Sequence, residues 1–112
     1  MRIARGDVWL ADHGRPMGRE QGHVRPCVIL SGAALNDVPL GIVMATPITS
    51  TDRGWPSHIE ISTATSGLLK RGWAMAEQFR TTSVRRLKQR LGYVDNDTLE
   101  RIQVALLHLL HP

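Results

Sequence analysis

"GREQGHVRPCVIL", residues 18–30, is the most informative stretch of this 112-residue sequence, because a polar run containing glycine passes directly into an apolar one. The short apolar run after Pro26 predicts a strand over residues 26–31 that is buried on both faces. The loop before it, from His13 to Val24, is long for a hairpin, and loops of this length are often functional. Glu20, Gln21 and Arg25 therefore stand at the mouth of the predicted core.

Further short runs on both sides of this stretch are apolar or alternate between apolar and polar residues, which is typical of strands. They cover residues 7–12, 41–46, 57–62, 73–81 and 91–94. Pro47 is expected to end the strand at 41–46, because proline cannot donate to a ladder. Turn-rich segments are expected at 48–56 and 66–72, and a short helix at 84–88.

The last element is predicted to be a helix that packs one apolar face on the sheet. Apolar residues recur there at helical spacing, and they are Leu99, Ile102, Leu106, Leu109 and Leu110. Asp95 or Asp97 can cap its start, because a side-chain oxygen there satisfies free amides. Many short strands with one terminal helix predict a mainly β fold with some α, a small, partly closed antiparallel barrel formed by a single domain over residues 1–112.

The amino-acid composition indicates what kind of partner and which cellular compartment the protein suits. The formal net charge is +4, and of the 14 basic residues only Lys70 and Lys88 are lysines. Arginine forks match phosphate geometry, so this bias points either to an anionic partner or to a solvated basic surface. Cys27 is the single cysteine, which excludes an internal disulfide, favours a reducing compartment and predicts a buried inert thiol. No apolar signal segment opens the chain, so we expect a cytoplasmic protein.

Several kinds of chemistry find no support in the sequence. His108 and His111 are close together without a cysteine pair or carboxylate cluster, so a zinc site is not expected. No glycine-rich phosphate loop follows a strand, and no nucleophile elbow is present. The basic stretch from Lys70 to Arg90 would suit a nucleic acid, although a solvated face is the simpler interpretation for Arg85, Arg86 and Lys88. A set of polar residues from loops and strand ends remains, namely Glu20, Gln21, Arg25, Thr49, Ser50, Thr51, Arg53, Glu77, Gln78, Arg80 and Thr81.

Five blocks of sequence, in order, resemble one known family. They are "RGDVWLAD" (5–12), "EQGHVRPCVILS" (20–31), "TPITSTDRGWP" (46–56), "AEQFRT" (76–81) and "LGYVDNDTLERI" (91–102). Together they are similar to the MazF/PemK family of toxin–antitoxin ribonucleases. The resemblance implies an SH3-like barrel of the CcdB/MazF type with a C-terminal helix. It further implies a homodimer that cuts single-stranded RNA without a metal or other cofactor, and a cognate acidic antitoxin as partner.

The resemblance also implies roles for particular residues. The arginine of the "EQxxxRP" block is Arg25, the threonine of the "PIT" block is Thr49, and both are catalytic in the family. The glutamate of the first block, Glu20, belongs at or beside the catalytic site, and Glu77 and Gln78 belong to the segment that lines the RNA groove. We expect attack by a ribose 2′-hydroxyl on the adjacent phosphorus. The expected RNA contacts are Gln21, Arg53, Glu77, Gln78 and Arg80.

Two alternatives stay open on the sequence alone. CcdB-like toxins share the fold and poison DNA gyrase through a short apolar C-terminal motif, which the ending "LLHLLHP" does not resemble. A binding module that kept the fold and lost the chemistry is the other alternative. Replacing Arg25 with alanine separates them, since only an enzyme would lose cleavage while keeping its fold.

Overall fold

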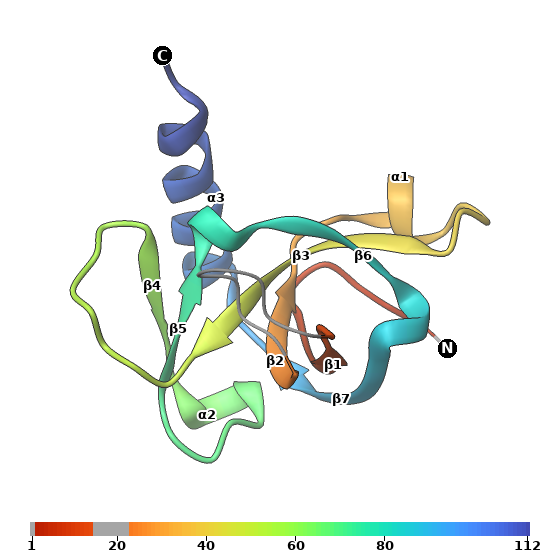
Figure 1. The fold of residues 1–112 in the computed structure, drawn as a ribbon, viewed down its shortest axis with the longest axis horizontal. Helices are drawn as coiled ribbons and strands as arrows, with labels where there is room; N and C mark the ends of the chain where they lie inside the picture. Colours follow the sequence, from red (N-terminus) through yellow and green to blue (C-terminus); the bar gives the residue numbers. More distant parts are fainter. Residues whose placement is uncertain (1, 15–22) are drawn as a thin grey trace.

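Seven antiparallel strands form a bent, partly open sheet, and a C-terminal helix packs against it (Figure 1). The structure is a computed structural model that describes residues 2–14 and 23–112. The strands are β1 (Asp7–Asp12), β2 (Val24–Ile29), β3 (Ile42–Thr49), β4 (His58–Ile61), β5 (Gly72–Met75), β6 (Arg80–Ser83) and β7 (Leu87–Tyr93). The α-helices are α1 (Ala33–Asn36), α2 (Thr63–Ser66) and α3 (Asn96–Leu110), and the 3-10 turns are η1 (Ala76–Gln78) and η2 (Val84–Arg86).

The long strand β3 organises the sheet, whose strand order is β4-β5-β3-β2-β1-β7. One edge of β3 pairs with β2, while the other edge pairs with β6 over residues 42–45 and with β5 over residues 48–49. The expectation that Pro47 ends this strand is wrong. Pro47 lies inside β3 at the change of neighbour, where neither β5 nor β6 pairs with it, so its missing amide proton costs no rung on that edge.

The predicted strand at residues 73–81 is wrong in its middle. It is divided into β5 and β6 by the 3-10 turn η1, which contains Glu77 and Gln78. The division lets the chain move from one segment of β3 to the next, which a straight strand cannot do. Three smaller differences concern element bounds. β2 begins and ends two residues before the predicted strand. The predicted helix at 84–88 is the 3-10 turn η2, and the predicted strand at 91–94 is part of the longer β7.

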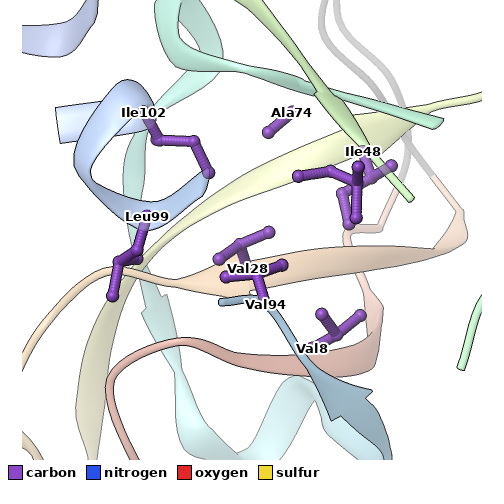
Figure 2. Packing of buried hydrophobic residues seen from close by; sticks show 8 residues of the cluster. Val8, Val28, Ile48, Ala74, Val94, Leu99 and Ile102 are labelled. Atoms are coloured by element: carbon purple, nitrogen blue, oxygen red, sulfur yellow. The ribbon is translucent and has the colours of Figure 1, made fainter. Parts of the chain in front are cut away.

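Two apolar clusters fill the two faces of the sheet, because neighbouring residues of a strand point to opposite sides. Val8 and Val28 enter the first cluster, where Leu99 and Ile102 of α3 cover them (Figure 2). Trp9 and its partner Cys27 enter the second cluster, inside the bend of the sheet. The second cluster also contains Ala11, Ile29, Val43, Ala45 and Leu87.

Helix α3 begins as predicted, but only its first half is packed. The Asp95 side chain accepts a hydrogen bond from the Thr98 amide at 2.7 Å, so Asp95 is the N-cap. Leu99 and Ile102 are buried, whereas Leu109 and Leu110 are exposed, so the expected stripe is only partly in the core. The reason is visible in Figure 1, where the C-terminal half of the helix extends beyond the sheet. Within the described ranges, no helix is long and apolar enough to cross a membrane.

Candidate functional site

Arg25 and Thr49 lie at the ends of two paired strands. The antiparallel pairing of β2 with β3 sets Cys27 opposite Pro47 and Ile29 opposite Ala45. Continued by two residues, the same register sets Arg25 opposite Thr49, and residues directly opposite in a sheet project from the same face. That face carries Cys27 and the second apolar cluster, so the two polar residues stand at its open end.

The Thr49 hydroxyl is held in one orientation by its own loop. Its oxygen accepts a hydrogen bond from the Thr51 amide at 3.2 Å, and the residue is only 3% exposed. A hydroxyl has one proton to donate besides its acceptor lone pairs. With the amide on its acceptor side, Thr49 can present that proton to an anionic oxygen.

Arg80 begins β6 on the same face of the sheet. Its partner across the ladder is Ala45, which itself faces Ile29 of β2. The guanidinium donates from Nη2 to Nδ1 of His13, the residue that follows β1. The pairings set Arg80 beside Ala45, four residues along β3 from Thr49. Its bond to His13, whose ring also meets the Arg25 backbone, brings the guanidinium towards the Arg25 end of β2.

His13 is a buried neutral ring in this group. Burial and, after it, the Arg80 and Arg86 charges lower its pKa from 6.5 to about 4, against the opposing effects of the Arg25 backbone and the Asp12 carboxylate. The residue is 7% exposed, and its Nε2 has no hydrogen-bond partner among residues 2–14 and 23–112. At neutral pH the ring is uncharged, so the positive charge here belongs to the arginines.

Glu77 is exposed, but hydrogen bonds hold its side chain. Its two carboxylate oxygens contact the Ser57 hydroxyl at 2.7 Å and Nε2 of His58 at 2.9 Å. Burial on its own raises the pKa of the Glu77 carboxyl, but these hydrogen bonds outweigh it and hold the pKa below 4.5. The His58 side chain is buried, and its ring packs against Trp55 at 4.9 Å between centroids. Glu77 thereby ties the turn η1 to the start of β4.

Of the other expected RNA contacts, Arg53 and Gln78 belong to the described part of the chain. Arg53 is exposed in the segment between β3 and β4, with its guanidinium 5.6 Å from the centre of the Trp55 ring. Gln78 is half-buried at the end of η1. Glu20 and Gln21 lie outside the described residues. The geometry thus unites Arg25 with Thr49 and Arg80 with His13, while Glu77 turns to His58.

Cys27 is buried, which confirms the prediction of a structural thiol. Burial raises its pKa to about 12, only partly offset by the Trp9 backbone and the Arg80 charge. A thiol with this pKa stays protonated at neutral pH and is a poor nucleophile. Across the described part of the chain, no three histidine, cysteine, aspartate or glutamate side chains gather as a metal site would require.

Two buried histidines, His13 and His58, were missed as parts of this region by sequence reasoning. His13 could have been found from alternation, because positions 9, 11 and 13 follow one face of β1. His58 had no comparable signal, since its partner Glu77 is 19 residues away on an element that was expected to be a strand.

The group as a whole is rich in donors to anions. Arg25 and Arg80 each offer a charged fork, and Thr49 adds a hydroxyl. Fixed donors of this kind are suited to stabilise negative charge that develops on phosphoryl oxygens.

Comparisons with known proteins agree with this chemistry. A family model described as a PemK-like, MazF-like toxin of type II toxin–antitoxin systems matches residues 4–110. Endoribonuclease EndoA of Bacillus subtilis is 31% identical over 107 residues, which cover 95% of this chain and 92% of that protein. The fold is also similar to the solved structure of MazF from Deinococcus radiodurans, with a TM-score of 0.80 and 32% identity over 96% of this chain and 94% of that chain. A second similar structure is a mycobacterial endoribonuclease in complex with its cognate antitoxin, with a TM-score of 0.79 and 27% identity over 96% of this chain and 94% of that chain.

Proposed function

Since the chain belongs to the PemK-like, MazF-like toxin family of type II toxin–antitoxin systems and is an endoribonuclease, we propose that Arg25 and Thr49 form its RNA-cleaving centre. The observation that supports this assignment best is the β2–β3 register, which, continued by two residues, sets Arg25 opposite Thr49 on one face. Thr49 is also oriented by the Thr51 amide, so its proton is available to the substrate.

In the proposed reaction, the 2′-oxygen of one ribose attacks the adjacent phosphorus and loses its proton. The bond from phosphorus to the 5′-oxygen of the next nucleotide breaks, and that oxygen takes up a proton. The products are a 2′,3′-cyclic phosphate and a 5′-hydroxyl. Negative charge builds on the phosphoryl oxygens during the step, and preorganised donors to such oxygens are usually the largest catalytic contribution.

Arg25 would supply two of these donors through its planar fork, and Thr49 would supply a third. Arginine is a poor base because it stays protonated, so stabilising charge is its principal role. We assign to Glu20 the task of accepting the 2′-hydroxyl proton or of orienting Arg25. No metal is needed in this scheme, and cleavage in excess chelator tests that point.

Single-stranded RNA would lie across the same end of the barrel, with unstacked bases open to hydrogen bonding. Arg80 and Arg53 would contribute positive charge, and the latter also borders the exposed ring of Trp55. Gln21 and Gln78 would contact base edges. Glu77 would contribute chiefly by holding η1 in place, because its oxygens are already bound to Ser57 and His58.

The chain's partner as a toxin of this family is a cognate antitoxin, as the MazE–MazF structures illustrate for the Deinococcus protein. We further propose that residues 1–112 act as one domain, that two copies form a homodimer, and that the protein works in the cytoplasm, where its RNA substrate and a reducing environment for Cys27 are found.

The test compares single-turnover cleavage of a long single-stranded RNA by the wild type and by Arg25 and Thr49 variants. Removing one preorganised donor typically costs about 100- to 1,000-fold in rate. Arg25→Ala should lose at least that much, and Arg25→Lys should recover only part of it because lysine lacks the fork. Thr49→Ser should stay close to the wild type, whereas Thr49→Ala should fall about 100-fold.

Arg101→Ala is the matched control, because Arg101 is exposed on α3 and forms an ion pair with the exposed Asp97. Circular dichroism of each variant checks the fold. Full cleavage by a folded Arg25→Ala protein would refute the assignment. An inactive wild type that is folded and free of antitoxin would instead favour gyrase poisoning or a binding-only role.

A further inference from the structure

A small cavity lies beside the proposed centre, between the end of β1 and the strand β6. Its volume is about 160 Å³, and its lining residues are His13, Arg80, Thr81, Thr82 and Arg86. At roughly 30 Å³ for each water, this volume holds a few waters or one compact anion, and it is too small for a folded element of another protein. We call it the β6 cavity.

Two residues that line the β6 cavity each carry a buried polar atom without a hydrogen-bond partner in the described part of the chain, Nε2 of His13 and Oγ1 of Thr82. The tautomer of His13 follows from its other nitrogen. Arg80 can only donate, so Nδ1 is the acceptor and the proton of the neutral ring must sit on Nε2. The Arg25 backbone interacts with the ring, but no acceptor among residues 2–14 and 23–112 meets full hydrogen-bond geometry at Nε2–H, so a ligand or water is needed to complete this buried donor.

Positive charge in the β6 cavity is not neutralised by the described part of the chain. Arg80 donates to His13, and Arg86 donates from Nη1 to the backbone oxygen of Asp12 at 3.1 Å. Neither guanidinium has a carboxylate within 4.0 Å among residues 2–14 and 23–112. The nearby Asp12 carboxylate is bound to the Gly14 amide at 2.9 Å. A buried donor, two guanidiniums and two hydroxyls together are complementary to an anion with several oxygens.

We propose that the β6 cavity binds a backbone phosphate of the RNA substrate, next to the phosphate that is cleaved. The inference rests on the proposed function and assigns new binding roles to His13, Thr82 and Arg86. RNA is favoured over other anions because the His13 ring also adjoins the Arg25 backbone, so a strand held at Arg25 passes the cavity. Occupying the cavity fixes the register of the strand relative to Arg25 and Thr49.

The experiment measures binding of a single-stranded 2′-O-methyl RNA, which cannot be cleaved because the attacking hydroxyl is absent. Fluorescence anisotropy at several salt concentrations gives Kd and its salt dependence for the wild type, His13→Leu, His13→Gln, Arg86→Gln and Arg85→Gln. Arg85→Gln is the matched control, because Arg85 is an exposed neighbour on the same 3-10 turn and does not line the cavity.

Arg86→Gln should weaken binding about tenfold at low salt and reduce the slope of log K against log salt by about 0.7, the value for one lost phosphate contact on a single strand. His13→Leu should weaken binding about fivefold because a buried donor is removed, while His13→Gln, which keeps a donor, should recover most of the affinity. Arg85→Gln should leave both the affinity and the slope within about 0.2 log units of the wild type.

Equal losses for Arg85→Gln and Arg86→Gln would mean diffuse surface charge and would overturn the proposal. Unchanged RNA binding, with loss of affinity for inorganic phosphate or for a poly-glutamate peptide, would mean that the cavity takes a free anion or an acidic protein segment, and would overturn it too. Arg86 is exposed, so its variant keeps the test valid if His13→Leu does not fold. Cleavage of ordinary RNA by the wild type is measured separately, so failure of the proposed function is distinguished from failure of the cavity.

Discussion

His13 should make this protein lose stability in mild acid, and replacing it with glutamine should remove that loss. The unfolded chain binds a proton on this ring below pH 6.5, whereas the folded chain binds it only below about 4. Between these values the unfolded state holds more protons, so stability falls as pH falls through this window and is fully present above it. Burial sets most of this difference, and the Arg80 and Arg86 guanidiniums add to it, while the Arg25 backbone and the Asp12 carboxylate oppose it.

The magnitude follows from the two pKa values. At about 1.4 kcal/mol for each tenfold change in proton affinity, the difference between 6.5 and about 4 corresponds to roughly 3 kcal/mol over the whole window. Solvent at the mouth of the β6 cavity screens part of this, so we expect about 1 to 2 kcal/mol to be lost between pH 7.5 and pH 5.

The assay is urea unfolding, monitored by tryptophan fluorescence, of the wild type and His13→Gln at closely spaced pH values. Other titrating groups are common to both proteins, so the difference between the two free energies of unfolding isolates His13. The difference should change by about 1 to 2 kcal/mol in favour of His13→Gln as the pH is lowered from 7.5 to 5. A difference that is constant with pH would refute the buried neutral ring.

Further changes test the core, one turn and the Glu77 contacts. Ile102→Ala should lower the free energy of unfolding by about 2 to 5 kcal/mol in urea, because the Ile102 side chain of α3 is fully buried in the first apolar cluster. Gly67→Ala should unfold at a much lower temperature, because Gly67 has a φ of +77° and a Cβ there would lie 2.1 Å from the Leu91 backbone oxygen. Gly54→Ala should lower the unfolding temperature far less, because Gly54 has a similar φ of +68° but open space around its Cβ position. Glu77→Gln should lower the free energy of unfolding above pH 4.5 and make it vary less with pH. The reason is that the lowered pKa of the Glu77 carboxyl contributes stability that is lost as the pH falls through the folded value. Urea unfolding at several pH values that showed the same pH dependence for both proteins would contradict this.

The strands that the sequence predicted well are those whose pattern is local. β1 was predicted with its correct ends, because its short apolar run is bounded by Gly6 and a polar loop. Pro47 was misjudged because its tolerance depends on β3 changing partner there, which is a property of the whole sheet. The apolar residues at the end of α3 were placed in the core because helical spacing shows which face is apolar, and spacing does not show where the sheet ends.

The candidate site was also predictable from the sequence only in part. The resemblance to the family points to Arg25 and Thr49, but only the register of β2 with β3 sets them opposite one another. The bond from Glu77 to His58 depends on the turn η1, which the alternating pattern of residues 73–81 concealed. His13 and its unpartnered nitrogen depend on the approach of β6 to β1, elements that are 67 residues apart along the chain.

The central claim, that this fold cuts RNA by 2′-hydroxyl attack on a phosphate held by Arg25 and Thr49, is tested most directly by the chemistry of the cut ends. A long single-stranded RNA is incubated with the purified protein in excess chelator, and both ends at each cut are identified by mass spectrometry. Attack by the 2′-hydroxyl should leave 2′,3′-cyclic phosphates paired with 5′-hydroxyls, and Arg25→Ala should make no cuts. Cuts that leave 5′-phosphates, or cuts that require a divalent metal, would contradict it.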